Sequence, residues 1–294
     1  MIGRFAPSPT GPLHFGSLVA ALASYLEVKS GKHQADSCWL VRMEDLDKPR
    51  EVNGAADDVL RTLEAFGFAW DGAVMYQSQR LDAYEAALAK LKPYSYSCIC
   101  SRREIADSAT QGIDGLIYPG TCRNRQTLNK QHATRIKVQN KNISFTDAIQ
   151  GTISQHLARD IGDFILKRAD NICAYQLAVV VDDAAQGVNH IVRGADLLHS
   201  TPRQIYLQQL LGYIKPSYAH VPIVVNSQGE KLSKQTLAAP IDAKNAAQLL
   251  VKALQFLGQS PPQALIKAPT HEIFAWATLH WQMYLVPKVP NLST

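Results

Sequence analysis

The sequence lacks any long apolar run. No stretch of its 294 residues approaches the roughly 20 consecutive apolar residues that a membrane-spanning helix needs. The N-terminus also lacks the basic segment followed by an apolar one that marks a secretory signal peptide. Repeats and low-complexity tracts are missing as well, and 46% hydrophobic with 19% charged residues is typical of a globular chain. We therefore expect a folded cytoplasmic protein.

Cysteine is scarce and unevenly distributed. An odd count of five in a cytoplasmic protein argues against a disulfide framework. Three of the five, Cys98, Cys100 and Cys122, lie in one short stretch. Zinc takes four ligands in a tetrahedral array, so these thiolates predict a structural zinc site. Tyr118 is the candidate for the fourth ligand, with His132 or a water molecule as alternatives.

Both common nucleotide-binding fingerprints are missing. The chain contains neither G-x-G-x-x-G nor a P-loop motif, so a phosphate site has to be built from other residues. An excess of acidic residues is missing too, because 30 Lys and Arg against 25 Asp and Glu give a net charge of +5. This charge is compatible with a polyanionic partner such as nucleic acid, although many enzymes carry a similar excess.

The start of the chain predicts a βαβ unit. Ile2–Phe5 forms a buried strand, residues 17–26 are strongly helical, and Trp39–Met43 returns to a strand. The Pro- and Gly-rich loop 7–16 then presents backbone amides at a helix N-terminus, which is a ready anion site. His14 in this loop can donate to a phosphate oxygen. Taken alone, the loop is equally well explained as a proline-rich turn with an exposed histidine.

The remaining pattern predicts an α/β fold with a Rossmann-like parallel sheet. We expect helices over residues 54–66, 81–91 and 202–211, strands within 134–157, 163–168 and 220–225, and a mostly helical C-terminal region. The apolar run Leu177–Val181 is predicted to be a central parallel strand. Thr201 is the predicted cap of helix 202–211, and Gly212 is its predicted stop.

A second candidate site follows a glycine-containing turn. Lys231 and Lys234, in the segment Glu230–Gln235, can neutralise the charge of a transferring polyphosphate. In isolation this segment is better explained as a solvated basic turn. Taken together, the proline-rich loop and this segment resemble the HIGH and KMSKS signatures of class I aminoacyl-tRNA synthetases.

Further motifs narrow the resemblance to the glutamyl- and glutaminyl-tRNA synthetase group. The matching segments, in the family's order, are Arg4–Gly11, Arg42–Asp47, Asp163–Asp183, Gly187–Gly194, Thr201–Gln204 and Ala219–Pro222. The resemblance covers residues 2 to about 237. It implies ATP-dependent activation of an amino acid carboxylate, followed by transfer of the acyl group to a tRNA hydroxyl.

The resemblance also implies roles for individual residues. The substrate carboxylate is already a nucleophile, so activation requires charge neutralisation and no general base. The implied catalytic residues are His14, Gly16, Lys231 and Lys234. The implied ATP site, with Mg²⁺ accompanying ATP, consists of Thr10, Gly11, His14, Gly16, Ser17 and Lys234. The implied L-glutamate site consists of Arg4, Ser8, Glu44, Tyr175 and Arg193. In it, Glu44 pairs with the ammonium and the arginines grip the carboxylates.

Some of these assignments have alternatives or departures. An internal salt bridge between Arg4 and Glu44 is the alternative to their role in substrate binding. Val179 stands where a glutamate-specific synthetase has Asn, so we expect weaker glutamate binding. Gln235 replaces the usual final Ser or Arg of the second signature.

The predicted domain organisation differs from that of a full synthetase. We expect a catalytic domain over residues 1–240, an insertion at about 93–157 that carries the zinc site, and a small helical region over 241–294 that resembles a stem-contact region. We expect no anticodon-binding domain. This combination is similar to a subgroup, the glutamyl-queuosine tRNA(Asp) synthetases. It implies transfer of glutamate to the queuosine base at the wobble position of tRNA(Asp).

The resemblance to this subgroup also implies where the tRNA binds. It implies that the insertion of a monomeric enzyme receives the tRNA(Asp) anticodon stem-loop. Candidate phosphate contacts there are Arg102, Arg103, Arg123 and Arg125, with a solvated basic face as the alternative for each. Two alternatives stay open: a minimal glutamyl-tRNA synthetase that charges a tRNA 3′ end, and a non-catalytic tRNA-binding protein derived from a synthetase.

Overall fold

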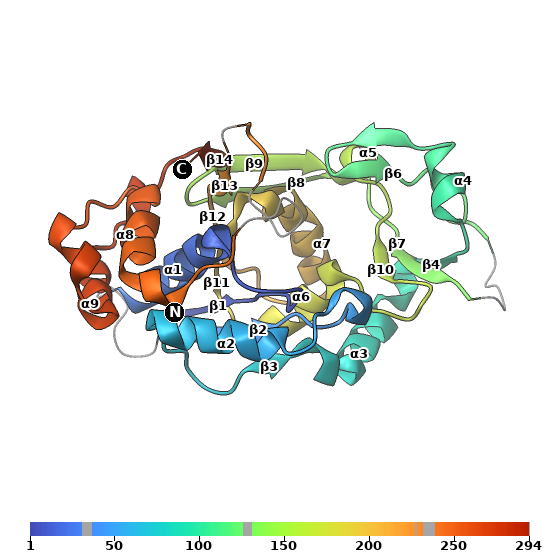
Figure 1. Cartoon of the computed structure of the whole chain (residues 1–294). Helices are drawn as coiled ribbons and strands as arrows, with labels where there is room; N and C mark the ends of the chain where they lie inside the picture. The colour runs from blue at the N-terminus through green and yellow to red at the C-terminus, as the bar shows by residue number, and fades with distance from the viewer. Residues whose placement is uncertain (31–36, 126–130, 227, 232–238, 294) are drawn as a thin grey trace.

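The chain forms an elongated molecule with three parts. The computed structural model describes residues 1–30, 37–125, 131–226, 228–231 and 239–293. An α/β body occupies the centre, the C-terminal helices form one end, and a small β-rich lobe forms the other end (Figure 1). Within these ranges no helix is long and apolar enough to cross a membrane.

The N-terminal strands form one side of the central sheet. β1 (Ile2–Phe5), β2 (Cys38–Met43) and β3 (Met75–Tyr76) pair in parallel, and α1 (Phe15–Lys29) lies between β1 and β2 in the chain. The predicted βαβ unit is therefore confirmed. β1 lies beside β11 (His190–Gly194), where the backbone N–H of Asn189 donates to the carbonyl oxygen of Ile2.

The sheet continues on the other side of β1. β11 pairs in parallel with β12 (Ser217–Val221), β12 pairs in parallel with β8 (Asn142–Asp147), and β9 (Gly151–His156) pairs antiparallel with β8. The predicted Rossmann-like parallel sheet is thus confirmed. β8 and β9 fall within the expected insertion in sequence, yet they pair with strands of the main sheet.

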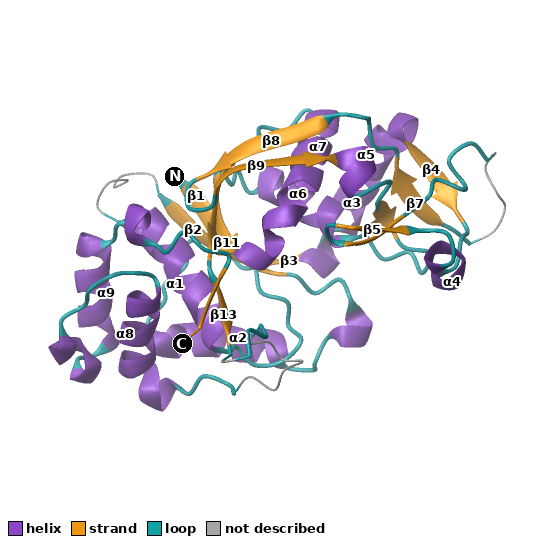
Figure 2. Cartoon of the chain, turned by 90° about the horizontal axis from the view of Figure 1, so that it is seen from above, coloured by secondary structure: helices purple, strands orange, loops and turns teal. Residues whose placement is uncertain are grey.

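Helices pack against this sheet in two apolar cores. One core joins α1, α2 (Ala55–Phe66), α8 (Ala246–Phe256) and α9 (Thr270–His280). The other joins α3 (Leu81–Leu91), α6 (Tyr175–Ala185) and α7 (Thr201–Leu211). Figure 2 shows α8 and α9 gathered beside α1, and α6 with α7 near β8. The two cores fix the strands whose ends carry the site.

The β-rich lobe has its own small sheet. β4 (Ser95–Cys98), β7 (Ala133–Ile136) and β10 (Ile165–Lys167) pair antiparallel. The hairpin of β5 (Thr110–Gly112) and β6 (Gly115–Ile117) lies nearby, with the short helices α4 (Arg102–Ala106) and α5 (Leu157–Asp160) (Figure 2).

Two sequence-based assignments are wrong. Leu177–Val181 lies in helix α6, where all five residues are buried between α3 and α7. A short run that is apolar on every side cannot be assigned by periodicity, because a buried strand and a buried helix look alike. Ser200, not Thr201, precedes α7 as its cap residue. Gly212 ends α7 at φ 71°, as predicted.

The C-terminal region is helical but also contains a strand. Pro222 separates β12 from β13 (Ile223–Val225), so the single strand predicted over 220–225 is two. β14 (Asn291–Ser293) pairs in parallel with β13. This pairing returns the end of the described chain to the central body.

Candidate active site

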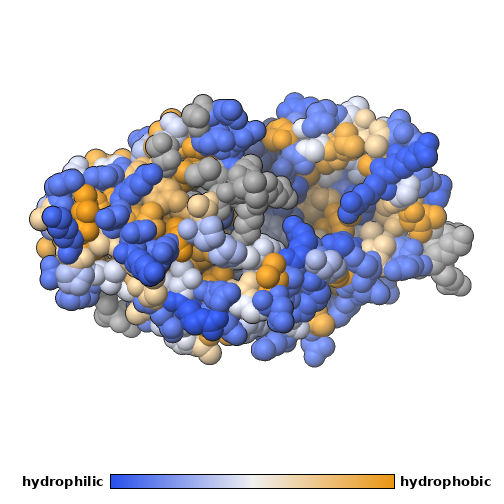
Figure 3. Space-filling view, in the orientation of Figure 1, coloured by the Kyte–Doolittle hydropathy of each residue, from blue (hydrophilic) through white to orange (hydrophobic). Residues whose placement is uncertain are grey.

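A cavity of about 780 Å³ opens at the carboxyl ends of β1, β2 and β11. Ligands of α/β sheets bind at such strand ends. The predicted residues that line it are Arg4, Ser8, Thr10, His14, Gly16, Ser17, Glu44, Tyr175, Arg193 and Lys231. Gly11 belongs to the same loop but is not among the lining residues. Lys234 and Gln235 lie outside the described residues. The surface is hollowed between the central body and the β-rich lobe (Figure 3).

His14 is held at the N-terminus of α1. Its Nδ1 accepts a hydrogen bond from the backbone N–H of Ser17 at 3.3 Å, so the ring caps the helix. In the neutral ring the proton then lies on Nε2, which makes that nitrogen a donor. Gly16 and Ser17 follow in the first turn, where backbone N–H groups and the helix dipole favour an anion. This end of the cavity suits a phosphate chain.

Lys231, in the segment after β13, lines the same cavity. Its Nζ lies 2.5 Å from Oδ2 of Asp196, and both side chains are partly exposed. Asp196 also lines the cavity, although sequence reasoning did not single it out. The pairing of β11 with β12 brings together Asp196 after one strand and the segment after the other, and no local pattern signals this contact.

Asp183 anchors the arginines beneath the cavity. Its Oδ1 accepts from Nε of Arg4 at 3.1 Å and from Nη1 of Arg42 at 2.8 Å, and all three side chains are buried. Burial favours the neutral form of Asp183, but the two guanidinium groups outweigh it and lower the pKa of this carboxyl. Arg42 and Asp183 fell within matching motifs, yet neither was predicted to support the site.

Glu44 lines the cavity, and its ion pair with Arg42 is long. Its Oε1 lies 3.5 Å from Nη2 of Arg42, while the ion pair of Arg4 goes to Asp183. Among the described residues, Arg4 and Glu44 thus pair with Asp183 and Arg42 instead of with each other, and their role in substrate binding stays a prediction. Burial raises the pKa of Glu44 above its ordinary value, even though Arg42 and Arg4 oppose this shift. A bound ammonium group would favour the ionised form.

Arg193 is oriented by a buried chain of hydrogen bonds. Its Nε donates to Nε2 of His220 at 3.0 Å, and its Nη2 donates to Thr201 at 2.9 Å. Nδ1 of His220 lies 2.6 Å from Oδ2 of Asp147. Among the described residues, Nη1 of Arg193 is buried and has no hydrogen-bond partner. Because Arg193 lines the cavity, this donor can bind a ligand carboxylate.

Burial keeps His220 neutral. It lowers the pKa of His220 to about 4, although Asp147 opposes the shift. The neutral ring donates from Nδ1 to Asp147 and accepts from Arg193 at Nε2. Val179, by contrast, is fully buried in α6 and is not among the residues that line the cavity. The expected weakening of glutamate binding by Val179 stays a prediction.

Three cysteines meet in the β-rich lobe. The sulfur atoms of Cys98, Cys100 and Cys122 lie within 4.8 Å of one another. Oη of Tyr118 lies 3.4 Å from the sulfurs of Cys98 and Cys100, and it accepts from the backbone N–H of Cys122 at 2.8 Å. Three soft thiolates and a phenol oxygen around one point fit a tetrahedral zinc ion. His132 is not part of this group within the described ranges.

The cluster already perturbs its own thiols. Burial alone would raise the pKa of Cys122, but hydrogen bonds from Tyr118 and from the backbone outweigh it and lower that pKa to about 7. Burial raises the pKa of Cys100. A metal ion would favour the thiolate form of each cysteine.

The four candidate arginines of the lobe differ in their surroundings. Arg102, Arg103 and Arg125 are exposed. Arg123 is half-buried, pairs with Asp163 at 3.1 Å and donates to the carbonyl oxygen of Val138. Arg123 thus ties the Cys122 segment to the small sheet, which leaves the other three as the better candidates for phosphate contacts.

Comparison with known proteins agrees with this geometry. The family model "tRNA synthetases class I (E and Q), catalytic domain" matches residues 1–264. A Glutamyl-Q tRNA(Asp) synthetase from Dechloromonas aromatica is 57% identical over 97% of this chain and 95% of the relative. One from Pseudomonas aeruginosa is 49% identical over 99% of this chain and 97% of the relative.

The fold is also similar to solved structures. A glutamate-tRNA synthetase from Elizabethkingia anophelis superposes with a TM-score of 0.78 at 23% identity, covering 100% of this chain and 68% of that one. At this identity the likeness concerns the fold alone. The family match and the near full-length relatives show that the chain belongs to the class I (E and Q) tRNA synthetases and, within them, to the Glutamyl-Q tRNA(Asp) synthetase family.

Proposed function

We propose that this chain uses ATP to activate L-glutamate and transfers the glutamyl group to the queuosine base at the wobble position of tRNA(Asp). The observation that carries the proposal is that one cavity is lined by two chemically different groups of residues. Arginines and Glu44 line it together with His14 and the N-terminal residues of α1. The near full-length relatives with this activity in their name support the choice of acceptor.

In the first step, the α-carboxylate of glutamate attacks the α-phosphorus of ATP and pyrophosphate leaves. Arg193 and Arg4 bind the carboxylates of glutamate, and Glu44 binds its ammonium group. These contacts hold the nucleophile in line and reduce the entropic cost of the reaction. Tyr175 and Ser8 add hydrogen bonds.

Charge develops on the departing pyrophosphate. His14 donates from Nε2 to a phosphate oxygen, while Lys231 and Lys234 neutralise the leaving group, with Mg²⁺ accompanying ATP. Lys231 would exchange its pairing with Asp196 for a phosphate oxygen. Thr10, Gly11, Gly16 and Ser17 complete the ATP site.

In the second step, a hydroxyl of the acceptor attacks the acyl carbon of glutamyl-adenylate and AMP leaves. A hydroxyl of the queuosine ring is the attacking group in this proposal. The exposed Arg102, Arg103 and Arg125 of the lobe would position the anticodon stem-loop through its phosphates. We propose that one monomer suffices, with residues 1–240 catalytic and 241–294 as a stem-contact-like region.

The cysteine cluster has a structural role in this proposal. Cys98, Cys100, Cys122 and Tyr118 would hold a zinc ion that cross-links segments of a lobe with a small core. The ion would lie in that lobe and take no part in acyl transfer.

The proposal is tested by offering labelled glutamate and ATP to tRNA(Asp) with and without queuosine. We expect label on the queuosine-containing tRNA alone. Label on both tRNAs that disappears after oxidation of the 3′-terminal ribose would identify a minimal glutamyl-tRNA synthetase instead. No label and no glutamate-dependent pyrophosphate exchange would identify a non-catalytic protein.

A further inference from the structure

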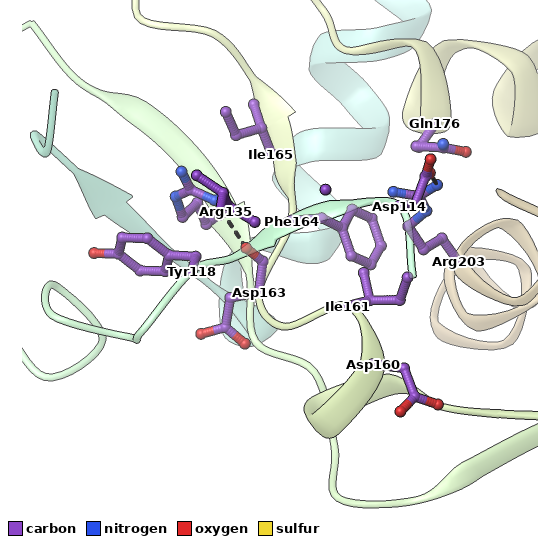
Figure 4. A pocket seen from close by; sticks show the side chains of 12 residues that line it. Asp114, Tyr118, Arg135, Asp160, Ile161, Asp163, Phe164, Ile165, Gln176 and Arg203 are labelled. Carbon is purple, nitrogen blue, oxygen red and sulfur yellow. Dashed lines mark hydrogen bonds and ion pairs between the residues drawn. The ribbon is translucent and has the colours of Figure 1, made fainter. Parts of the chain in front are cut away.

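A second cavity lies between the β-rich lobe and the central body. Its volume is about 310 Å³, and it shares no lining residue with the catalytic cavity. Figure 4 shows Phe164 in its middle, Arg135 with Tyr118 on one side, and Arg203 with Gln176 on the other. Such a volume lies at the lower end of small-molecule sites, so one ring with its sugar fills it.

Two arginines line this cavity, one buried and one partly buried, and each has a buried Nε donor. Arg135 is only 7% exposed, stacks 4.0 Å above the Tyr118 ring and donates through Nη1 to the carbonyl oxygen of Asp163. Arg203 pairs with Asp114 and donates to Ser200. Among the described residues, neither Nε atom has a hydrogen-bond partner. Unsatisfied buried donors are costly, so both call for an acceptor.

The charges of the lining residues indicate which class of ligand the cavity can bind. Two arginines line the cavity, but so do Asp114, Asp160 and Asp163, which disfavours an anionic phosphate. Phe164 adds a flat aromatic face (Figure 4), and Ile161 and Leu116 add apolar surface. A neutral aromatic ring with acceptor atoms at its edge matches both features. Unstacked bases of RNA loops are recognised in this way, by stacking and by hydrogen bonds to their edges.

The position of the cavity indicates which base it takes. Gln176 lines this cavity and Tyr175 lines the catalytic one, and the two residues are consecutive at the start of α6. The β5–β6 hairpin beside it exposes Ile113 and Leu116, each about half exposed. We propose that this cavity binds the nucleobase adjacent to the one that is glutamylated. This inference rests on the proposed function.

The test uses a synthetic queuosine-containing anticodon stem-loop, intact or with an abasic residue directly 5′ or 3′ of the queuosine. With the unaltered enzyme, one of the two abasic stem-loops should lower kcat/KM for glutamate transfer about tenfold, the size of a lost stacked base. Arg203→Gln should lower kcat/KM on the intact stem-loop by a similar factor. On the abasic stem-loop that is the poorer substrate, Arg203→Gln should cause no further loss of kcat/KM, because the side chain acts through the base that is already missing.

Controls separate binding from folding. Arg61→Gln removes an exposed Arg–Asp pair in α2, with Asp58, and neither residue lines the cavity, so it should leave transfer unchanged. Leu116→Ser alters an exposed lining residue and should reproduce part of the loss. Pyrophosphate exchange reports whether the catalytic cavity is intact, and it should stay normal in all three variants.

Two results would overturn the inference and leave the proposed function standing. One is that neither abasic residue lowers kcat/KM for transfer. The other is that the losses from Arg203→Gln and from the abasic residue multiply when the two changes are combined. Absence of transfer to any queuosine-containing stem-loop by the unaltered enzyme would overturn both.

Discussion

At the residue scale, the proposed binding of the substrate carboxylate by Arg193 depends on His220, which itself does not line the cavity. His220→Ala should raise KM for glutamate in pyrophosphate exchange about tenfold, because Arg193 loses the acceptor that orients it. KM for ATP should stay unchanged. His220→Gln, whose amide oxygen can accept from Arg193, should restore part of the affinity.

A matched control exists on the neighbouring strand. His190 is also buried, but its Nδ1 contacts Ser217 and its Nε2 lies 3.6 Å from Glu27. His190→Ala should therefore leave KM for glutamate near the unaltered value. Equal effects of the two substitutions would contradict a positioning role for His220.

With Glu44 in its proposed role, we expect glutamate binding to depend on pH. Because burial raises the pKa of Glu44, this carboxyl takes up its proton at a higher pH than an ordinary glutamate does. The protonated form cannot pair with the substrate ammonium. We expect kcat/KM for glutamate to fall on acidification, starting above the ordinary pKa of 4.5. Glu44→Gln should lower kcat/KM at all pH values and remove this acidic limb; an unchanged limb would assign it to another group.

At the scale of elements, the cysteine cluster should hold the β-rich lobe together without supporting activation. Cys98→Ser should lower the bound zinc measured by atomic absorption, since one of four ligands is lost. Transfer to tRNA should fall at least tenfold, while pyrophosphate exchange stays within about twofold, because the catalytic cavity lies in another part of the fold. Cys173→Ser, a buried cysteine outside the cluster, is the control. Equal loss of both activities would contradict this division.

The packing of α8 depends on the glycine that follows it. Gly258 has φ +74°, and a Cβ there would lie 2.2 Å from the carbonyl oxygen of Leu285. Gly258→Ala should lower the free energy of unfolding by about 2 kcal/mol or more, measured by denaturant titration. Gly212 has a similar φ of +71° with open space around it, so Gly212→Ala should cost only about 1 kcal/mol. Similar costs at both positions would contradict the steric argument.

The same elements mark the limits of sequence reasoning. β1, α1 and β2 follow from clear patterns, and the cysteine cluster follows from residue type and spacing. Leu177–Val181 does not, because α6 is buried on several sides and hides its helical period. Asp147 and His220 meet through the register of β8 and β12, which no local pattern determines.

At the scale of the whole molecule, the net charge of +5 is modest, so we expect tRNA binding to depend on a few individual arginines. Arg102→Ala or Arg103→Ala should weaken tRNA binding and reduce the slope of log K against log salt by about one, as loss of one phosphate contact does. Arg123→Ala, which breaks an internal ion pair, should lower stability more than it changes the slope. Unaltered slopes in the exposed variants would remove those residues from the interface.

The proposed function requires that the anticodon end of tRNA, and not its 3′ end, enters the catalytic cavity. The most direct measurement offers labelled glutamate and ATP to two synthetic RNAs in parallel, a queuosine-containing anticodon stem-loop of tRNA(Asp) and an acceptor minihelix that ends in the tRNA 3′ sequence. We expect label on the stem-loop and none on the minihelix. Label on the minihelix, with none on the stem-loop, would contradict the proposed function.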